Sequence, residues 1–326
     1  MSSIAVNAIT DANGGSTTSI NSVTPNTSNV VGKNRIINGN FDFWQRGTTA
    51  SYSVASSQYL SDRWQMRTTA TANVTTSQQS FTVGQTDVPN NPKYFYRWDI
   101  TSHTAGTGIL EQRIEDVSTF AGNTCTLSFW AKCSTAQTLS NSYLQVFGTG
   151  GSATVTTSGS SFSLTTSWQK FTATFTLPSI SGKTIAGGND YLNIRFNMPN
   201  AVCTVDIAQV QLEAGSSATE FEHRPYTTEL QLCKRYYESS PRIDLNQNVA
   251  LILTYRLANQ YWLNFSYLVE KRAQPTFVLG AGSVWSGGTP TIDAGVAHLI
   301  LYSTAAVYLN EGPTTTPYSF ALNSEL

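Results

Sequence analysis

The sequence predicts an all-β fold, in which a two-sheet β-sandwich is followed by a short helix and a small second β-domain. Three observations support this prediction. Apolar and polar residues alternate with a period of two over many short segments, Gly, Ser and Thr residues separate these segments, and the 326 residues show no pattern typical of a long helix. Many short strands joined by turns are typical of β-sandwiches.

The composition narrows the class of protein. Only 12% of the residues are charged, whereas about 25% is typical of globular proteins, so we expect a surface of Ser, Thr, Asn, Gln and Gly. A formal net charge of −1 argues against a nucleic-acid partner, which requires a basic surface. The chain has no apolar run of about 18 residues and no pattern of a signal peptide, so we expect no membrane insertion and synthesis and folding in a cytosol.

Residues 1–33 are predicted to form an extended N-terminal arm. They contain no aromatic residue, and their only charged side chains are those of Asp11 and Lys33, so this stretch cannot form a core of its own. Apolar residues alternate near its start, at Ile4, Val6 and Ala8. Two interpretations remain open: an attachment arm that orders against another protein, and a flexible leader.

Residues 34–226 are predicted to form the sandwich. In its first strand, Ile36 and Ile37 enter the core and Gly39 permits a tight backbone. Aromatic residues that supply bulk to the core follow directly, at Phe41, Phe43 and Trp44.

The clearest strand runs from residue 125 to residue 133. Its odd-numbered residues are apolar, which places Trp130, at an even position, on the outward face. In the segment 143–147 we assign the even-numbered residues, which are apolar, to the inward face, and Tyr143 and Gln145 to the outward face. Further strands are predicted within residues 68–85, 94–100, 109–116, 171–177 and 192–198.

A change of parity marks the closing strand of the sandwich. Its apolar residues are odd-numbered up to Ile207 but even-numbered from Val210, and one extra residue, a β-bulge, produces such a change. Pro225 then blocks strand continuation. Thr228 and Gln231 have the spacing of a capping box, which predicts a short helix.

The cysteines do not suggest a disulfide framework. Cys125 and Cys133 lie in one predicted strand, about 26 Å apart at the usual rise per residue, far beyond the limit of about 7 Å between bridged Cα atoms. We expect both to be reduced core residues, whereas the spacing of Cys203 and Cys233 decides nothing. No CxxC pattern or Cys/His cluster is present, so we expect no zinc site.

Residues 227–326 are predicted to form the helix and the small second β-domain. Its strand candidates lie at 249–253, 261–265, 276–279, 297–302 and 305–309. Each carries few apolar residues, so we expect this domain to complete its core against the sandwich or against copies of itself.

Three segments occur in an order and spacing that are typical of a known family. They are NRIINGNFDFWQRGTT with YLSDRWQ (34–65), QLEAGSSATEFEHRPYTTELQLCKRYYE (211–238) and VEKRAQPTFVL (269–279). They resemble segments of tail-fibre and related virion proteins of tailed bacteriophages. The resemblance implies that the sandwich is a carbohydrate-binding-module-like jelly roll. It also implies a homotrimer that is assembled in the host cytoplasm and is attached to other virion proteins through the N-terminal arm.

The resemblance also bears on metal binding. Jelly rolls of this style often hold a structural calcium ion through an Asp-Asp-Val run in the closing strand. This chain has Ala208, Gln209 and Val210 there, with Asp206 two residues earlier. Ala and Gln side chains do not supply the anionic oxygens that calcium prefers, so we expect no metal and no other cofactor.

Residues suited to catalysis are few. Hydrolysis of a polysaccharide needs two carboxylates across a cleft, and the acidic cluster of Glu111, Glu115 and Asp116 is interpreted as solvated charge at a strand end. We expect Asp62 and Arg63 to pair with each other and fix a loop. The sequence therefore predicts no catalytic residues and a protein that is not an enzyme.

A glycan site combines exposed aromatic side chains with amides and an arginine, because sugars present an apolar face and a rim of hydroxyls. The predicted outward faces supply such a set: Trp130, Tyr143, Gln145, Asn193, Arg195 and Asn197. The alternative is that Trp130 and Tyr143 pack under a loop or at a subunit contact.

These predictions favour a structural virion protein, a tail fibre or fibre tip that binds host-surface polysaccharide without turnover. One alternative is a head-fibre or decoration protein of the capsid, which would share the folds. The other is a polysaccharide depolymerase, which would require a cleft with paired carboxylates.

Overall fold

The computed structural model describes residues 32–69, 72–239, 254–257, 260–267, 269–279, 284–286, 289–303, 308–310 and 320–326. Within these residues the fold is all β apart from one helix, which confirms the predicted fold class. The predicted N-terminal arm lies outside the described residues except for Gly32 and Lys33. The strand candidate at 249–253 and part of that at 305–309 also lie outside them.

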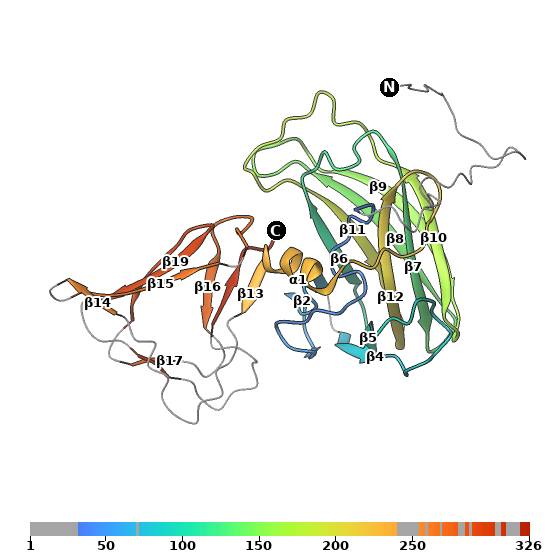
Figure 1. Ribbon diagram of the computed structural model, residues 1–326. Helices are drawn as coiled ribbons and strands as arrows, with labels where there is room; N and C mark the ends of the chain where they lie inside the picture. Colours follow the sequence, from blue (N-terminus) through green and yellow to red (C-terminus); the bar gives the residue numbers. More distant parts are fainter. Residues whose placement is uncertain are drawn as a thin grey trace, which may run out of the picture.

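Two six-stranded antiparallel sheets form the sandwich (Figure 1). The first sheet contains, in spatial order, β1 (Thr49–Tyr52), β4 (Ala72–Ser80), β5 (Tyr94–His103), β12 (Cys203–Ala214), β7 (Thr124–Cys133) and β10 (Gln169–Thr176). The second contains β2 (Ser56–Tyr59), β3 (Trp64–Thr68), β6 (Gly108–Glu115), β11 (Tyr191–Asn197), β8 (Gln137–Val146) and β9 (Val155–Leu164).

The core lies between the two sheets and is rich in aromatic rings. Phe129 of β7 packs edge-on against Phe162 of β9 and Phe196 of β11, with ring centroids 5.0 and 4.9 Å apart. These contacts join the first sheet to the second. The thiols of the four cysteines are buried and unbridged, as predicted for Cys125 and Cys133.

Strand β12 contains the predicted bulge. Its register against β7 shifts between Ala208 and Gln211, and Gln209 has a left-handed backbone with a φ of 49°. The side-chain amide of Gln209 donates to the backbone oxygen of Pro89 at 2.8 Å. Because the bulge inserts one residue, Ile207 and Val210 both point into the core.

Helix α1 (Tyr226–Lys234) begins earlier than the capping box predicted. Pro225 occupies the N-cap position without a side-chain cap, so Thr228 lies inside the first turn. Proline suits a helix start, because its φ of −53° is already set and its missing N–H would have no partner there. Glu229 in the first turn instead accepts a hydrogen bond from Arg224 at 3.0 Å.

Small sheets follow the helix. One contains β13 (Tyr237–Ser239), β21 (Phe320–Asn323) and β16 (Thr276–Leu279). Another contains β14 (Thr254–Leu257), β15 (Gln260–Ser266), β19 (His298–Ser303) and β18 (Thr291–Ala294), and a pair is formed by β17 (Val284–Ser286) and β20 (Tyr308–Asn310). Figure 1 shows α1 between the sandwich and these sheets, with β13 next to the helix.

The end of the chain is bonded back to the sandwich. The buried Arg63 donates to the carboxylate of Glu325, and its guanidinium lies 3.4 Å from the centroid of the Tyr236 ring. Tyr59 donates from its hydroxyl to the backbone oxygen of Leu326 at 3.1 Å. These contacts attach the second β-domain to the jelly roll at a point far from the covalent linker in sequence.

Asp62 does not pair with Arg63, contrary to the expectation from their sequence. Its carboxylate accepts hydrogen bonds from the backbone and side chain of Gln45 at 3.2 and 2.7 Å, and Arg46 lies 3.7 Å away. Burial raises the pKa of Asp62 to about 6, despite the opposing effect of Arg46. Asp62 and Arg63, although adjacent in sequence, thus contact different residues: Asp62 contacts Gln45 and Arg46, and Arg63 contacts Glu325 and Tyr236.

The raised pKa of Asp62 predicts a pH dependence of stability. The folded protein keeps the Asp62 proton to a higher pH than the unfolded chain does, so stability falls as pH rises from about 4 to about 6, by about 3 kcal/mol. Urea unfolding of the native protein and of Asp62→Asn at pH 4 and pH 7 measures this. Because the variant cannot ionise at this position, a difference between the two proteins that does not change with pH would contradict the prediction.

Candidate functional site

The six predicted site residues do not form one site. Trp130 lies on β7 in the first sheet, whereas Asn193, Arg195 and Asn197 lie on β11 in the second. These side chains point away from the core, since the residues that alternate with them on both strands fill the space between the sheets. The thickness of the sandwich therefore separates Trp130 from the β11 residues.

Tyr143 and Gln145 of β8 point inward, so their assignment to the outward face is wrong. They are 0% and 1% exposed, and the Tyr143 ring stacks on Phe175 with 3.5 Å between centroids. The side-chain amide of Gln145 donates to the backbone oxygen of Pro178 at 3.0 Å. In the sequence, a buried glutamine whose amide bonds to a backbone oxygen distant in the chain cannot be told from an outward-facing glutamine. The predicted inward and outward faces of this strand were therefore exchanged.

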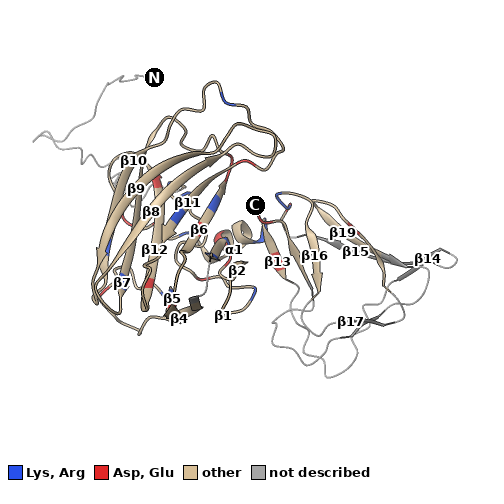
Figure 2. Ribbon diagram, turned by 180° about the vertical axis from the view of Figure 1, so that it is seen from behind, with Lys and Arg blue, Asp and Glu red and all other residues tan. Residues whose placement is uncertain are grey.

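Charged and amide side chains gather on the outer face of the second sheet, which we call the arginine face. It comprises Arg67 of β3, Glu111 and Arg113 of β6, and Asn193, Arg195 and Asn197 of β11. Strand β6 pairs with β3 on one side and with β11 on the other, which brings these residues together. Figure 2 shows basic residues on the neighbouring strands β6 and β11.

Glu111 is the centre of the arginine face. Its side chain is 0% exposed, and one carboxylate oxygen accepts hydrogen bonds from Arg195 at 2.7 Å and from Asn193 at 3.0 Å. The other oxygen accepts two from Arg113, at 3.1 and 3.3 Å, and Arg67 lies 3.8 Å from the carboxylate. The interpretation of Glu111 as solvated charge is therefore wrong: this buried carboxylate orients the guanidinium groups of Arg113 and Arg195 and lies close to that of Arg67.

Two acceptors on this face are buried without a hydrogen-bond partner in the described part of the chain. They are Oδ1 of Asn193 and Oε1 of Gln65, whose position on β3 is directly opposite Glu111. At one end of the face, Arg113 donates to the backbone oxygen of Leu326, and its guanidinium lies 5.0 Å from the Tyr191 ring centroid. Arg113 is thus engaged by the chain end, and its side chain is 18% exposed, against 35% for Arg67 and 20% for Arg195.

The other acidic residues of the predicted cluster make structural contacts. The Glu115 carboxylate accepts hydrogen bonds from Arg235 at 2.8 and 3.0 Å and from the Tyr236 hydroxyl at 2.9 Å. Burial alone would raise the pKa of Glu115, but these hydrogen bonds outweigh burial and lower it. Asp116 accepts a hydrogen bond from the backbone N–H of Ser118 at 2.8 Å.

Trp130 lies on the same outer face as an aromatic cluster. The rings of Phe81, Phe95 and Trp168 pack against one another with centroids 4.8 to 5.4 Å apart. Lys132, two residues from Trp130 on β7, lies with its ammonium 5.3 Å from the Trp168 ring centroid. Because these rings are largely occupied with one another and with a cation, they leave less free aromatic surface than their number suggests.

Asp206 of the closing strand is engaged by basic side chains. Its two carboxylate oxygens accept hydrogen bonds from Arg97 at 2.8 and 2.9 Å, and Lys132 lies 3.7 Å away. Among the residues that the structure describes, no three His, Cys, Asp or Glu side chains are grouped to hold a metal ion. No helix in the described part is long and apolar enough to span a membrane.

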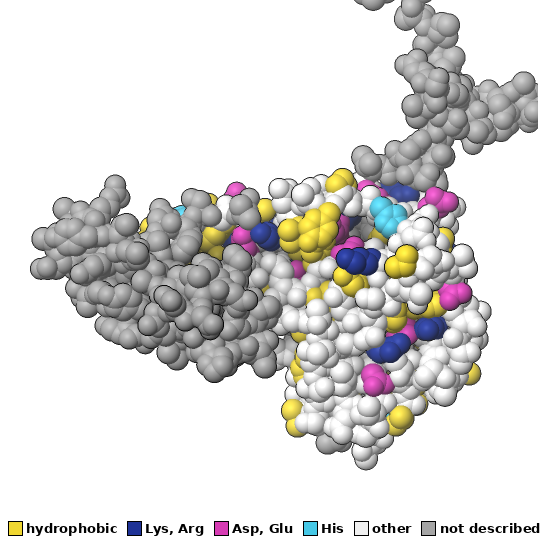
Figure 3. Space-filling view, turned by 60° about the horizontal axis from the view of Figure 1, so that its bottom comes forward, with side chains coloured by type: hydrophobic (Ala, Val, Ile, Leu, Met, Phe, Trp, Pro, Cys, Tyr) yellow, Lys and Arg dark blue, Asp and Glu magenta, His cyan; other side chains and the backbone are white. Residues whose placement is uncertain are grey.

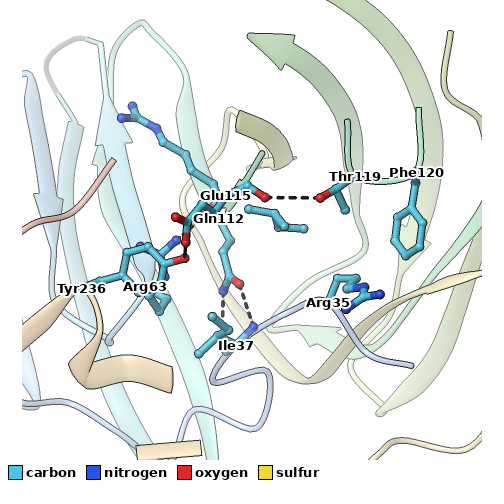
Figure 4. Close-up of a pocket in the computed structure, with 10 residues that line it drawn as sticks. Arg35, Ile37, Arg63, Gln112, Glu115, Thr119, Phe120 and Tyr236 are labelled. Carbon is cyan, nitrogen blue, oxygen red and sulfur yellow. Dashed lines mark hydrogen bonds between the residues drawn. The ribbon is translucent and has the colours of Figure 1, made fainter. Parts of the chain in front are cut away.

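A cavity of about 240 Å³ lies between the jelly roll and the residues after α1. Its polar groups are engaged in hydrogen bonds within the jelly roll and across this junction (Figure 4). The side-chain amide of Gln112 donates one hydrogen bond to the backbone of Ile37 and accepts another from it, both at 2.8 Å. The carboxylate of Glu115 accepts a hydrogen bond from the hydroxyl of Tyr236. We therefore assign this cavity a structural role.

Sequence reasoning missed Arg67 and Arg113. Arg113 stands within the predicted strand 109–116, which is the signal that could have found it, whereas Arg67 lies just before the predicted segment 68–85. Arg195 became their neighbour only through the pairing of β3, β6 and β11. The surface beyond the arginine face agrees with the composition. Figure 3 shows a face on which most side chains are polar and uncharged, with scattered hydrophobic and charged groups.

Comparisons with known proteins gave matches only among solved structures: no family model and no curated protein matches the chain. A tailspike protein 4 enzymatically active domain of Bacteriophage CBA120 matches with 14% identity and a TM-score of 0.34, over 56% of this chain and 21% of that chain. A CBM4 structure matches with 18% identity and a TM-score of 0.33, over 55% of this chain and 98% of that one. The CBM22-2 xylan-binding domain of Xyn10C from Paenibacillus barcinonensis matches with 17% identity and a TM-score of 0.33, over 51% and 98% of the two chains.

Proposed function

We propose that this protein is a structural protein of a tailed-phage virion, a tail fibre or fibre tip, that binds host-surface polysaccharide through the arginine face. The observation that carries the proposal is the buried Glu111, which accepts hydrogen bonds from Arg113 and Arg195 and lies 3.8 Å from Arg67. A guanidinium group donates several hydrogen bonds in one plane, which suits the hydroxyls and carboxylates of sugars. Because the donors are already oriented, binding a glycan costs little side-chain entropy.

The charge of the face favours an acidic glycan. Three guanidinium groups surround one carboxylate, so the face keeps an excess of positive charge. Among these groups Arg67 keeps the most exposed surface for a ligand, 35% of its side chain, against 20% for Arg195 and 18% for Arg113. We therefore expect polysaccharides that carry uronic acids or other acidic groups to bind better than neutral ones, and added salt to weaken their binding.

We expect binding without turnover, and the state of the carboxylates on the arginine face and next to it supports this expectation. A glycosidase needs one carboxylic acid that reaches the glycosidic oxygen and a second carboxylate opposite it. Glu111 has no exposed surface, and Glu115 is engaged by Arg235 and Tyr236. This arrangement supports a binding protein over the alternative of a depolymerase.

The experiment compares Arg195→Ala with Arg97→Ala. Arg97 is a matched control, because it is also a strand arginine that is paired with a carboxylate, but it lies on the first sheet. Surface polysaccharides purified from a panel of bacteria are passed over each immobilised protein, and retention and chain length are followed. We expect Arg195→Ala to reduce retention of the polysaccharide by roughly tenfold, equivalent to about 1.4 kcal/mol. Arg97→Ala should retain as much polysaccharide as the native protein, and the polysaccharide chain length should stay constant.

Other outcomes of this experiment would contradict the proposal in different ways. Shortened chains would establish a depolymerase. Equal retention by both variants would place glycan binding elsewhere on the molecule. No retention of any polysaccharide, together with location of the protein on the capsid in a virion reconstruction, would establish the head-fibre or decoration alternative.

Attachment and assembly complete the proposal. The protein assembles in the host cytoplasm as a homotrimer and joins other virion proteins through its N-terminal arm. Three copies would present three arginine faces, which raises avidity for a repetitive polysaccharide well above the affinity of one site, of the order of millimolar for a shallow sugar site. We expect light scattering to give three times the mass of the 35.4 kDa chain; a monomer at micromolar concentration would contradict the trimer.

A further inference from the structure

A second cavity, of about 280 Å³, lies where the start of the jelly roll meets the linker to α1. We call it the junction pocket. Three segments that are distant in sequence line it: the turn that holds Asn40 and Asp42, the residues Lys93 and Tyr94 at the start of β5, and the linker with the first residue of α1, which supply His223 and Tyr226. The arginine face does not share residues with it.

The walls of the junction pocket are fixed by hydrogen bonds. Arg224 of the linker donates to the backbone oxygens of Asn34 and Ile36 and to the carboxylate of Glu229. Glu229 also accepts a hydrogen bond from the backbone N–H of Asn38. The turn, the linker and the helix therefore hold one another, and the pocket exists before any ligand binds.

The aromatic wall of the pocket has a free surface. Tyr226 is 67% exposed, although its ring packs against that of the buried Phe43 with centroids 4.8 Å apart. Phe43 thus supports one side of the Tyr226 ring and leaves much of the rest to solvent. An aromatic ring that is held in this way is suited to stacking on the apolar face of a sugar.

Hydrogen-bonding groups stand beside this ring. The Asp42 carboxylate accepts a hydrogen bond from the Asn40 side-chain amide at 3.2 Å, which orients both groups. Oδ1 of Asn40 is buried without a hydrogen-bond partner in the described part of the chain. A small turn of the Asn40 side chain would expose this oxygen to a sugar hydroxyl, and Asp42 can accept a second hydroxyl.

We infer that the junction pocket binds one neutral pyranose ring, stacked on Tyr226 and hydrogen-bonded to Asn40 and Asp42. The volume of about 280 Å³ is near the lower end of small-molecule sites, which suits one sugar ring and not a chain. The inference rests on the proposed glycan-binding function and adds to it a second subsite with a different preference.

The charges around the pocket select against an acidic ring. Three carboxylates line it, those of Asp42, Glu222 and Glu229, against the cationic groups of Lys93 and Arg224. Arg224 is already bound to Glu229. An added carboxylate or phosphate would be repelled here, whereas the arginine face would attract it.

The test uses the full chain and ligand-observed NMR titrations with the methyl β-glycosides of glucose, galactose, N-acetylglucosamine and glucuronic acid. We expect at least one of the three neutral glycosides to bind with a Kd of the order of millimolar, and the glucuronide to bind more weakly in this pocket. Tyr226→Ala and Asp42→Asn should each weaken the neutral glycoside roughly tenfold. Tyr226→Phe, which keeps the ring, and Val83→Ala, at a side chain 100% exposed outside the pocket, should not.

The outcomes separate this inference from the proposed function. The junction pocket would not be a sugar site if none of the three neutral glycosides bound. The same conclusion would follow if Tyr226→Ala and Asp42→Asn left the binding unchanged. If Arg195→Ala abolished the binding instead, the sugar would bind at the arginine face. That result would support the proposed function and contradict the junction pocket as a sugar site. Binding in the pocket by a protein that retains no polysaccharide would support the pocket and contradict the proposed role of the arginine face.

Discussion

Replacing Glu111 by glutamine is expected to destabilise the jelly roll by about 3 kcal/mol, within the range measured when one partner of a buried ion pair is removed. The variant keeps the shape of the side chain but leaves Arg67, Arg113 and Arg195 close together without a counter-charge. Glycan retention should fall as well, because glutamine replaces one of the two acceptor oxygens with an NH2 donor and removes the charge that orients Arg195. Urea unfolding and the retention assay measure the two effects.

The matched control for this variant is Glu220→Gln. Glu220 is exposed, so removal of its charge should change stability by less than about 0.5 kcal/mol. If Glu111→Gln unfolds at the same urea concentration as the native protein, Glu111 does not organise the arginine face. Loss of retention with unchanged stability would instead indicate that Glu111 contacts the glycan.

Gly39→Ala is expected to have an effect of similar size for a different reason. A Cβ atom at position 39 would lie 2.1 Å from the backbone oxygen of Val210, and the backbone of Val210 also donates to the oxygen of Gly39 at 2.9 Å. The first turn would have to move away from the bulged strand β12, at a cost of about 3 kcal/mol. Thermal unfolding should show a midpoint lower by about 10 °C.

Gly84→Ala separates this clash from the general cost of losing a glycine. Gly84 has a left-handed φ of +80° but open space around its Cα, so alanine there should cost only about 1 to 2 kcal/mol. Equal midpoints for the two variants would show that the approach of Gly39 to Val210 is not tight. Because Gly39 also lines the junction pocket, its substitution should weaken binding of the neutral glycoside too.

The parts of the fold that were predictable depend on local patterns. The alternation over residues 125–133 and the parity change between Ile207 and Val210 predicted a strand and a bulge, because in both places the inward residues are apolar. The prediction failed at Tyr143 and Gln145, where the inward face includes a polar side chain whose partner, Pro178, is distant in sequence. The hydrophobicity pattern of one segment carries no information about a hydrogen-bond partner that is distant in the sequence.

The site was less predictable than the fold. Arg195 and Asn197 were correctly placed on an outward face, yet the group that organises this face, Glu111, read as ordinary strand-end charge. Its three guanidinium partners lie on three strands, and strand order in a sheet is set by the packing of the whole sandwich. The junction pocket likewise depends on Arg224 and Glu229, whose partners are near the start of the chain.

The return of the chain end to the sandwich has a mechanical consequence. The second β-domain is held to the jelly roll by the covalent linker and also by the pair formed between Arg63 and Glu325, which is supported by the stacking of Arg63 on Tyr236. A force that pulls the two domains apart is therefore shared between the linker and these noncovalent contacts, which include that of Tyr59 with Leu326 and can open and re-form without breaking a covalent bond. Such a junction can open under tension and close again when the tension is released.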